Sequence, residues 1–349
     1  MEYLEIAKSK LQTLRALDNY YILAIESSCD ETAVAITRNT EIVASVISSQ
    51  IDIHKRFGGV VPEIASRNHI LAIDNLVKEA FKKANLTFND ISVIAVTYGA
   101  GLLGALLVGV AYAKALAYAL QLPLIAINHV KSHVFANFIA HKDLQMPFMC
   151  LLVSGGHTEI LEVKSYHDIE ILGSTLDDAV GEAFDKVARV LGFSYPGGPE
   201  IEKHAKLGKN CISLPRAFKG EKHFNFSYSG LKTAVLNYVN TLKLKGQDIP
   251  YNDIACSFQT EAVAVLVEKA IRACKKNNYN KLCIAGGVAA NGYLRNELDK
   301  AGKKHNIEII APPKYLCTDN AAMVGVAGYF AIKEGIGASD LYQDADARA

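Results

Sequence analysis

The chain carries one short sequence pattern twice. The first copy is YILAIESSCDETAVAI (Tyr21–Ile36), and the second, FMCLLVSGGHTEILEV (Phe148–Val163), begins 127 residues later. In each copy an apolar run, a turn of small and polar residues and a second apolar run follow one another, which is typical of a β-hairpin. The repeat therefore predicts two similar α/β halves, each of which begins with a hairpin.

Helical patterns alternate with apolar strands along the rest of the chain. Apolar residues recur at helical spacing in Glu63–Lys83, and Pro62 is placed to begin that helix. A further strand is expected at Lys281–Ala285, and a final helix near Asp319 and Asn320, either of which can cap it. Two more helices are expected, at Asp177–Leu191 and Asp253–Lys275. The alternation places the chain in the α/β class.

Length and composition set broad limits on function. The 349 residues favour two domains, at about 100–200 residues each. The 37 basic and 36 acidic side chains give a net charge of +1, which argues against a protein whose main device is a basic surface for nucleic acid. Residues 202–222 form the one basic stretch, which a solvated surface explains more simply than a phosphate contact. The seven scattered cysteines favour a reducing compartment.

Residues 91–113 contain no charged side chain and are long enough to cross a membrane. Their four glycines favour a strand at Ser92–Thr97, a glycine loop and a helix to about Leu120 instead. The loop spells the dinucleotide pattern G-x-G-x-x-G, which needs an acidic residue about 20 positions later. None occurs between Asp90 and Asp143, so nicotinamide chemistry is rejected. We expect the glycines to let a buried helix pack closely on a sheet.

The second hairpin turn and one later glycine pair are candidate nucleotide contacts. Ser154, Gly155 and Gly156 offer backbone N–H groups with little steric hindrance, which suits an anion. Gly286-Gly287 follows another predicted strand and permits a close approach of a purine or ribose. Asp185, one or two turns into its helix, can contact ribose hydroxyls. Together these features indicate a nucleotide bound in a cleft.

His129 and His133 are the candidate metal ligands. Their i, i+4 spacing puts both side chains on one face of a helix, where they can share an ion, although two unrelated histidines fit the spacing equally well. Asp319 is a candidate third ligand, and its ordinary role would be that of a helix cap. The metalloprotease pattern H-E-x-x-H requires Glu where this chain has Val130, so that activity lacks its general base.

These motifs together resemble the bacterial tRNA adenosine threonylcarbamoyltransferase family (TsaD-like, formerly described as O-sialoglycoprotein endopeptidases). The resemblance extends from about residue 21 to residue 335. The segments that carry it are Ile25–Thr32, His54–His69, Asn128–His133, Leu152–Thr158, Asp177–Lys186, Tyr195–Pro199, Phe226–Lys232, Gly286–Arg295 and Thr318–Asn320.

The resemblance implies a fold and an activity. The fold is that of actin-like ATPases, sugar kinases and heat-shock chaperones, with two similar subdomains around a nucleotide cleft. We expect residues 1–20 as an N-terminal extension, residues 21–127 plus 311–340 as subdomain I, and residues 128–310 as subdomain II. The family transfers the threonylcarbamoyl group from threonylcarbamoyl-AMP to N6 of adenosine 37, in tRNAs that read codons beginning with A. A cytoplasmic location without a membrane segment is expected.

The resemblance also implies ligands and partners. One divalent metal ion, iron or else zinc, is expected at His129, His133 and Asp319. Residues expected to contact the adenylate are Leu152, Val153, Ser154, Gly155, Gly156, Asp185, Gly198, Glu202 and Asn291. Our own hypothesis is that Asp30 or Glu31 accepts the proton of the attacking amine. The expected partners are a catalytically inactive actin-like paralogue and a small ATPase of the same pathway.

The chain departs from the usual family pattern in a few places. Ala100 stands where Pro is usual, Glu159 where Gln is usual, and Val130-Lys131-Ser132 separates the two histidines. Both histidines are present, so the last departure bears on metal identity. The alternatives are an inactive nucleotide-binding scaffold of the same fold, which would need no metal, and a small-molecule kinase, which would make no modified tRNA.

Overall fold

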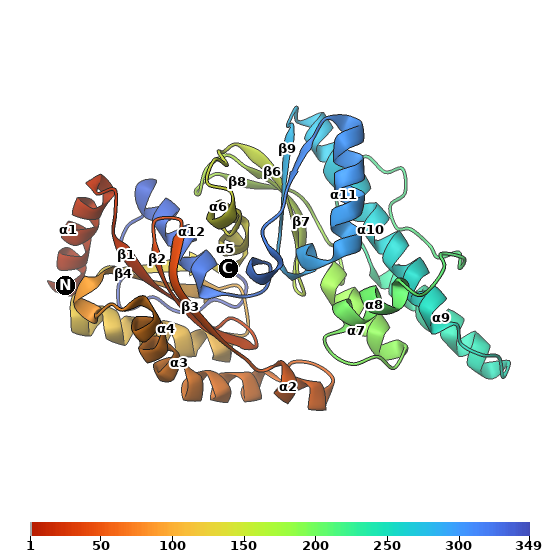
Figure 1. The fold of residues 1–349 in the computed structure, drawn as a ribbon, viewed down its shortest axis with the longest axis horizontal. Helices are drawn as coiled ribbons and strands as arrows, with labels where there is room; N and C mark the ends of the chain where they lie inside the picture. Colours follow the sequence, from red (N-terminus) through yellow and green to blue (C-terminus); the bar gives the residue numbers. More distant parts are fainter. Residues whose placement is uncertain (1) are drawn as a thin grey trace. The chain divides into compact units, whose positions relative to one another are not determined.

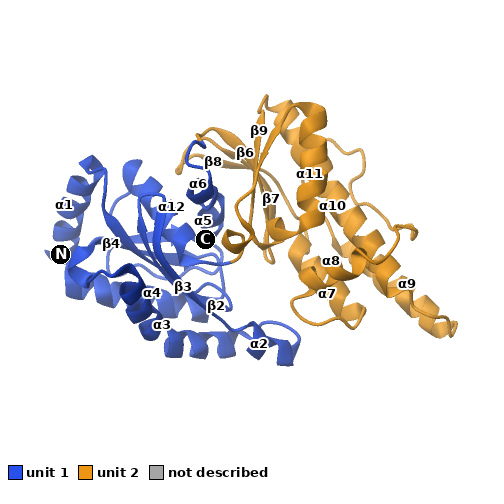
Figure 2. Ribbon diagram, in the orientation of Figure 1, with its two compact units in different colours: residues 1–144, 319–349 blue, residues 145–318 orange. Residues whose placement is uncertain are grey.

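A computed structural model describes residues 2–349 and divides the chain into two compact units. The first comprises the chain up to Leu144 together with residues 319–349, and the second comprises residues 145–318 (Figure 2). Each unit holds one five-stranded sheet with helices packed on it (Figure 1). The α/β class predicted from the sequence is confirmed.

The first unit is built on strands β1 to β5. Their bounds are Tyr21–Glu26, Glu31–Arg38, Glu41–Ser49, Ile91–Gly99 and Leu124–Asn128. Its helices are α1 (Glu2–Ala16), α2 (Ile51–His54), α3 (Pro62–Ala84), α4 (Leu103–Leu120), α5 (His129–Phe135), α6 (Asn137–Ala140) and α12 (Ala321–Lys333). Helices α3 and α4 pack on each other and on the sheet, while α12 packs on β1, β2, α1 and α5.

The second unit is built on strands β6 to β10. Their bounds are Phe148–Val153, Thr158–Val163, Ile169–Ser174, Lys281–Ala285 and Glu308–Ile310. Its helices are α7 (Val180–Val190), α8 (Gly197–Ala205), α9 (Ser229–Leu244), α10 (Tyr251–Lys276) and α11 (Gly292–His305). Short 3₁₀ turns lie in the two units at Lys55–Phe57, Phe88–Asp90, Gly287–Ala290 and Lys314–Leu316.

The two sheets have the same topology, so the repeat seen in the sequence is a repeat of the fold. Their strand orders are β3-β2-β1-β4-β5 and β8-β7-β6-β9-β10. In each sheet the first three strands in the sequence pair antiparallel, and the last two join parallel to the first. The predicted hairpins are β1–β2 and β6–β7. Their turns occupy equivalent positions.

The unit boundaries differ from the division expected from the sequence. Residues 128–144, expected in subdomain II, belong to the first unit, and residues 311–318 belong to the second. Helix α5 directly follows β5 and packs on α12, so it stays with the first sheet. The expected N-terminal extension contains α1, which buries Tyr3 and Leu11 and packs on α12, so it is part of the first unit.

Helix α4 accounts for the uncharged stretch. Within residues 2–349 it is the one helix long and apolar enough to cross a membrane, a test that core helices of soluble proteins also pass. It packs on β4 and α3. A Cβ added at Gly109 would lie 2.4 Å from the Ser27 hydroxyl, so this glycine allows the close approach between helix and sheet. The expected packing role is therefore confirmed at Gly109.

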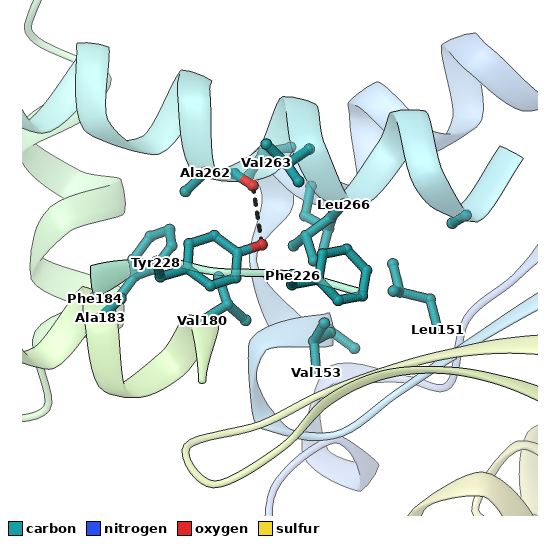
Figure 3. Packing of buried hydrophobic residues seen from close by; sticks show 14 of the residues in the cluster. Leu151, Val153, Val180, Ala183, Phe184, Phe226, Tyr228, Ala262, Val263 and Leu266 are labelled. Atoms are coloured by element: carbon teal, nitrogen blue, oxygen red, sulfur yellow. Dashed lines mark hydrogen bonds between the residues drawn. The ribbon is translucent and has the colours of Figure 1, made fainter. Parts of the chain in front are cut away.

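The core of the second unit lies under its hairpin turn. Leu151 and Val153 of β6 face apolar side chains of α7 and α10, among them Phe184 and Leu266 (Figure 3). The buried Tyr228 donates a hydrogen bond to the carbonyl of Ala262, 3.4 Å away. Burial of this kind contributes about 25 cal/mol per Å² of apolar surface and gives the turn a rigid base.

Candidate functional site

His129, His133 and Asp319 come together in the first unit. The two histidines lie on α5, where the Asn128 side chain caps the helix by accepting from the Lys131 N–H at 3.0 Å. The Asp319 Oδ1 lies 3.1 Å from His133 Nε2 and 3.5 Å from His129 Nε2. One ligand atom from each residue falls within 4.8 Å of the others. The three donors thus face a common point.

The start of helix α12 leaves the Asp319 side chain free of a capping role, so that it can join the two histidines. The side chain of Asn320, not Asp319, caps the helix by accepting from the Met323 N–H at 3.0 Å. The sequence could not separate these neighbours, because both residue types cap helices well. The structure assigns the cap to Asn320 and turns Asp319 toward the histidines.

The charges of this group are strongly coupled. Burial lowers the pKa of His129, but Asp319 and Glu26 outweigh it and raise that pKa to about 9. Burial alone would raise the pKa of Asp319, yet His129 and His133 lower it to about 2. The carboxylate is therefore ionised at neutral pH, as a metal ligand must be.

Glu26 is a residue that the sequence analysis missed. It ends β1, its side chain is 0% exposed, and its carboxylate lies 3.1 Å from His129 Nδ1. The same carboxylate accepts hydrogen bonds from the Ser28 N–H and the Thr97 hydroxyl, both at 2.6 Å. The sequence does show one unusual feature here: a charged residue stands at the end of the apolar strand Tyr21–Glu26. A buried carboxylate needs partners, and the sequence does not show them.

Asp30 and Glu31 lie where the first hairpin turn meets β2. Burial, with Asp319 and Asp30 nearby, raises the pKa of Glu31 to about 9. The buried His69 holds the same turn, with Nε2 2.9 Å from the Cys29 carbonyl and Nδ1 2.7 Å from the Thr32 hydroxyl. The acidic turn is thus fixed by an imidazole and lies close to Asp319.

The equivalent turn of the second unit is open. Ser154 closes it by donating its N–H to the His157 carbonyl at 2.8 Å and accepting the His157 N–H on its hydroxyl at 3.0 Å. Gly155 and Gly156 are exposed, and a Cβ at either would meet nothing within 4 Å. Within residues 2–349, neither glycine N–H has a hydrogen-bond partner. Two free amides in an open turn suit an anion.

Leu152 and Val153 lie on β6 directly before this turn. Their side chains are 1% and 0% exposed, so only their backbone can face a ligand. Asp185 on α7 accepts the Gly197 N–H at 2.7 Å, which fixes the start of α8. Gly198 is open, since a Cβ there would meet nothing within 4 Å.

The last two expected substrate residues make internal contacts. Glu202 of α8 accepts the Gly292 N–H at 3.3 Å and pairs with Lys206 at 3.0 Å. Asn291 caps α11 by accepting the Leu294 N–H at 2.9 Å, and its amide donates to Gln259 at 3.0 Å. Both polar ends of the Asn291 side chain are therefore engaged within the protein.

Relatives identify the family. Residues 41–326 match the family TsaD, described as tRNA N6-adenosine threonylcarbamoyltransferase. A protein of that name from Clostridium novyi is 57% identical over 317 residues, covering 90% of this chain and 93% of its own. A protein of the same name from Clostridioides difficile is 54% identical over 310 residues, covering 88% and 92%.

This chain belongs to the tRNA N6-adenosine threonylcarbamoyltransferase family. It is therefore an enzyme of the transferase class whose family acts on tRNA. The family resemblance predicted from the motifs is confirmed. Family membership implies a metal, and the two histidines with Asp319 form a group that can hold one. Imidazole nitrogen and carboxylate oxygen are ligands that zinc and iron both accept.

Solved structures show the fold of this family member. Full-length HypF in its phosphate- and nucleotide-bound form gives a TM-score of 0.61 at 17% identity, covering 92% of this chain and 47% of HypF. The (R)-2-hydroxyglutaryl-CoA dehydratase component A of Acidaminococcus fermentans gives 0.52 at 14% identity, covering 90% and 99%. The fold is the actin-like ATPase fold, as expected from the sequence.

Proposed function

We propose that this chain transfers the threonylcarbamoyl group from threonylcarbamoyl-AMP to N6 of adenosine 37 in tRNAs that read codons beginning with A, with release of AMP. The observation that carries the proposal is more than 50% identity to transferases of this name over about nine-tenths of the chain, with the His129, His133 and Asp319 donors converging. A scaffold without catalysis has no need of this donor set, so that alternative is not favoured.

We assign one divalent ion to His129, His133 and Asp319. Two imidazoles and one carboxylate that leave coordination positions open are typical of non-haem iron, so iron is the first choice and zinc the second. When bound, the ion supplies a Lewis acid that orients and polarises a substrate oxygen. The chain itself supplies the Nε2 atoms of the two histidines and an ionised carboxylate, which would bind the ion from one side and leave its other side open to substrate.

We assign the adenylate to the second unit. The free N–H groups of Gly155 and Gly156 suit the phosphate and the negative charge that develops on it. Asp185, Gly198 and Glu202 suit the ribose, because carboxylates accept hydroxyl hydrogens and the open glycine leaves room for the sugar. The remaining three expected residues would contact the adenylate without a free polar side chain. The side chains of Leu152 and Val153 are buried, so their backbone would face it, and the side chain of Asn291 is already hydrogen-bonded within the protein.

The reaction exchanges a carbon–oxygen bond for a carbon–nitrogen bond and moves one proton from N6 to a base. N6 of adenosine attacks the carbamoyl carbon, the bond from that carbon to the phosphate oxygen breaks, and AMP leaves with the electron pair. N6 loses a proton in the process. Because the exocyclic amine is a weak nucleophile, positioning should supply much of the acceleration. We propose that Asp30 or Glu31 takes the proton, and a cation near Asp319 would favour the ionised form that a base requires.

We propose a cytoplasmic location and two protein partners, a catalytically inactive actin-like paralogue and a small ATPase of the same pathway. The net charge of +1 fits an enzyme that shares its tRNA-binding surface with other chains.

The test is mass spectrometry of tRNA nucleosides after depletion of this protein. Threonylcarbamoyladenosine should fall, and it should return with the wild type and with His167→Ala, a variant of an exposed histidine that is not a member of the donor group. It should not return with His129→Ala. Unchanged nucleoside levels after full depletion would refute the transferase activity, and rescue by His129→Ala would refute the metal requirement.

A further inference from the structure

Glu26 is a buried carboxylate whose partners are all within the first unit. Its side chain is fully buried, and glutamate is almost never so placed unless it is paired. The ion pairs of residues 2–349 give it one partner, His129. Two further hydrogen bonds, from the Ser28 N–H and the Thr97 hydroxyl, fix the carboxylate in place. The carboxylate therefore links β1, β4 and the start of α5.

The contact with Glu26 determines which nitrogen of His129 faces Asp319. A histidine that binds a metal ion through one ring nitrogen can keep a proton only on the other nitrogen. His129 Nδ1 lies 3.1 Å from the Glu26 carboxylate and 3.1 Å from the Ser28 hydroxyl. The charged acceptor makes the stronger bond, so the proton belongs on Nδ1. Nε2, which lies 3.5 Å from Asp319 Oδ1, is then the nitrogen left to bind the ion.

His133 provides an internal contrast. Its Nε2 also faces Asp319, but its buried Nδ1 has no hydrogen-bond partner among residues 2–349. Behind one of the two candidate ligands lies a carboxylate, whereas the ring nitrogen behind the other has no such partner among those residues. This asymmetry makes the effect of Glu26 specific to His129.

We propose that Glu26 is the positioning residue of the metal site: it holds His129 with the proton on Nδ1 and Nε2 presented to the ion. The inference rests on the proposed metal site and goes beyond its ligands. A carboxylate behind a ligating histidine raises the basicity of that ligand, and loss of such a partner typically weakens metal binding about 10–100-fold.

The test measures zinc binding alone, without tRNA or adenylate. Glu26→Gln keeps the size of the side chain but replaces one oxygen with an amide donor. We expect its Zn²⁺ affinity, measured by competition with a chromophoric chelator, to fall about 10–100-fold. Ser28→Ala is the matched control, because it removes the neutral neighbour of the same nitrogen. Its effect should stay within about fivefold.

A double-mutant cycle separates positioning from general damage. In a His129→Ala background, Glu26→Gln should cause no further loss of affinity, since the group that it orients is absent. An equal loss in both backgrounds would overturn the proposal, and so would wild-type affinity of a folded Glu26→Gln protein.

A second measurement needs no variant and covers the case in which Glu26→Gln does not fold. In zinc-loaded wild-type protein with ¹⁵N-labelled histidine, NMR should show His129 protonated at Nδ1 and metal-bound at Nε2. Metal bound at Nδ1 would overturn the proposal. If zinc binding depends on Glu26 as expected but no tRNA is modified, the proposed reaction fails and this inference stands. If the wild type binds no divalent metal, both fail.

Discussion

The two hairpin turns occupy the same place in two sheets of the same topology, but their chemistry is opposite. After β1 comes Ser27-Ser28-Cys29-Asp30, with Glu26 before it and Glu31 after it. After β6 comes Ser154-Gly155-Gly156-His157. The first turn is acidic and close to two imidazoles and Asp319. The second has exposed glycines with free amides. One fold repeat therefore offers a place for a cation and a place for an anion.

Glu26 and Asp319 in the first unit have different partners from Asp178 in the second. In the first, Glu26 and Asp319 pair only with histidines among the residues described, and Asp30 and Glu31 raise the local negative charge. In the second, Asp178 beside the turn is neutralised by two lysines at 2.8 and 2.6 Å. The two lysines balance the charge of Asp178, so this carboxylate needs no metal ion. The carboxylates and imidazoles of the first group have no lysine partner within residues 2–349 and can bind one. The contrast predicts different consequences for similar substitutions.

The largest effect is expected from Asp319→Asn, which removes the carboxylate of the His129, His133 and Asp319 donor group. Zinc or iron affinity and tRNA modification should each fall by more than about 100-fold, beyond the range for partners that do not touch the metal. Chelator competition and nucleoside mass spectrometry measure the two. Asn320→Ser is the control: Ser is also a good cap, so metal binding should be unchanged. Retained affinity in Asp319→Asn would show that the ion binds elsewhere.

Asp178→Asn should leave metal affinity unchanged and lower stability instead. Burial raises the pKa of Asp178, but Lys186 and Lys232 outweigh it and hold that pKa below its ordinary value. Losing these charge-assisted bonds should cost about 2 kcal/mol at pH 7.

The sign of the pH dependence follows from the lowered pKa of Asp178. Its contribution is present above the ordinary aspartate range and is lost as pH falls and the native carboxyl takes up a proton. Thermal unfolding from pH 7 to pH 3 should show the variant and the wild type converging. Glu170→Gln, an exposed partner of Lys164, should change stability by less than about 0.5 kcal/mol. A pH-independent difference would contradict the ion-pair explanation.

Gly156→Ala tests the open turn. The new methyl group meets no protein atom within 4 Å, so the fold should be unaffected. It would project where the adenylate is proposed to bind, and we expect the KM for threonylcarbamoyl-AMP to rise about tenfold, as for other overpacked contacts. Gly337→Ala is the matched control, since it is also exposed and unobstructed. An unchanged KM would place the substrate away from this turn.

The sequence predicted this comparison only in part. Periodicity and turn residues were enough for both hairpins and for the helices expected at Glu63–Lys83, Asp177–Leu191 and Asp253–Lys275, whose ends lie within three residues of those of α3, α7 and α10, because those signals are local. Spacing alone paired His129 with His133, but only the structure shows that Asn320 takes the cap and leaves Asp319 free. Glu26 was missed because its partners come from distant segments, 71 and 103 residues away. The unit boundary at residue 144 depends on the packing of α5, which no local pattern encodes.

The smallest expected effect is a pH-dependent gain in stability from Glu31→Gln in chelator-treated protein. The pKa of Glu31 is raised from 4.5 to about 9. The folded state therefore keeps a proton that the unfolded chain releases, and stability falls as pH rises through this window. The variant removes that loss, so it should unfold about 2–4 °C above the wild type at pH 8.5 and should match it at about pH 3.5, below the ordinary pKa of glutamate. Added Zn²⁺ should reduce the difference, because a cation near Asp319 stabilises the ionised carboxylate.

The control is Glu63→Gln, at an exposed ion pair with Arg67, whose stability should show no such dependence on pH. A variant with the wild-type pH profile would mean that Glu31 does not hold an extra proton in the folded state. The acidic turn would then differ from the glycine turn in shape and not in its affinity for a cation.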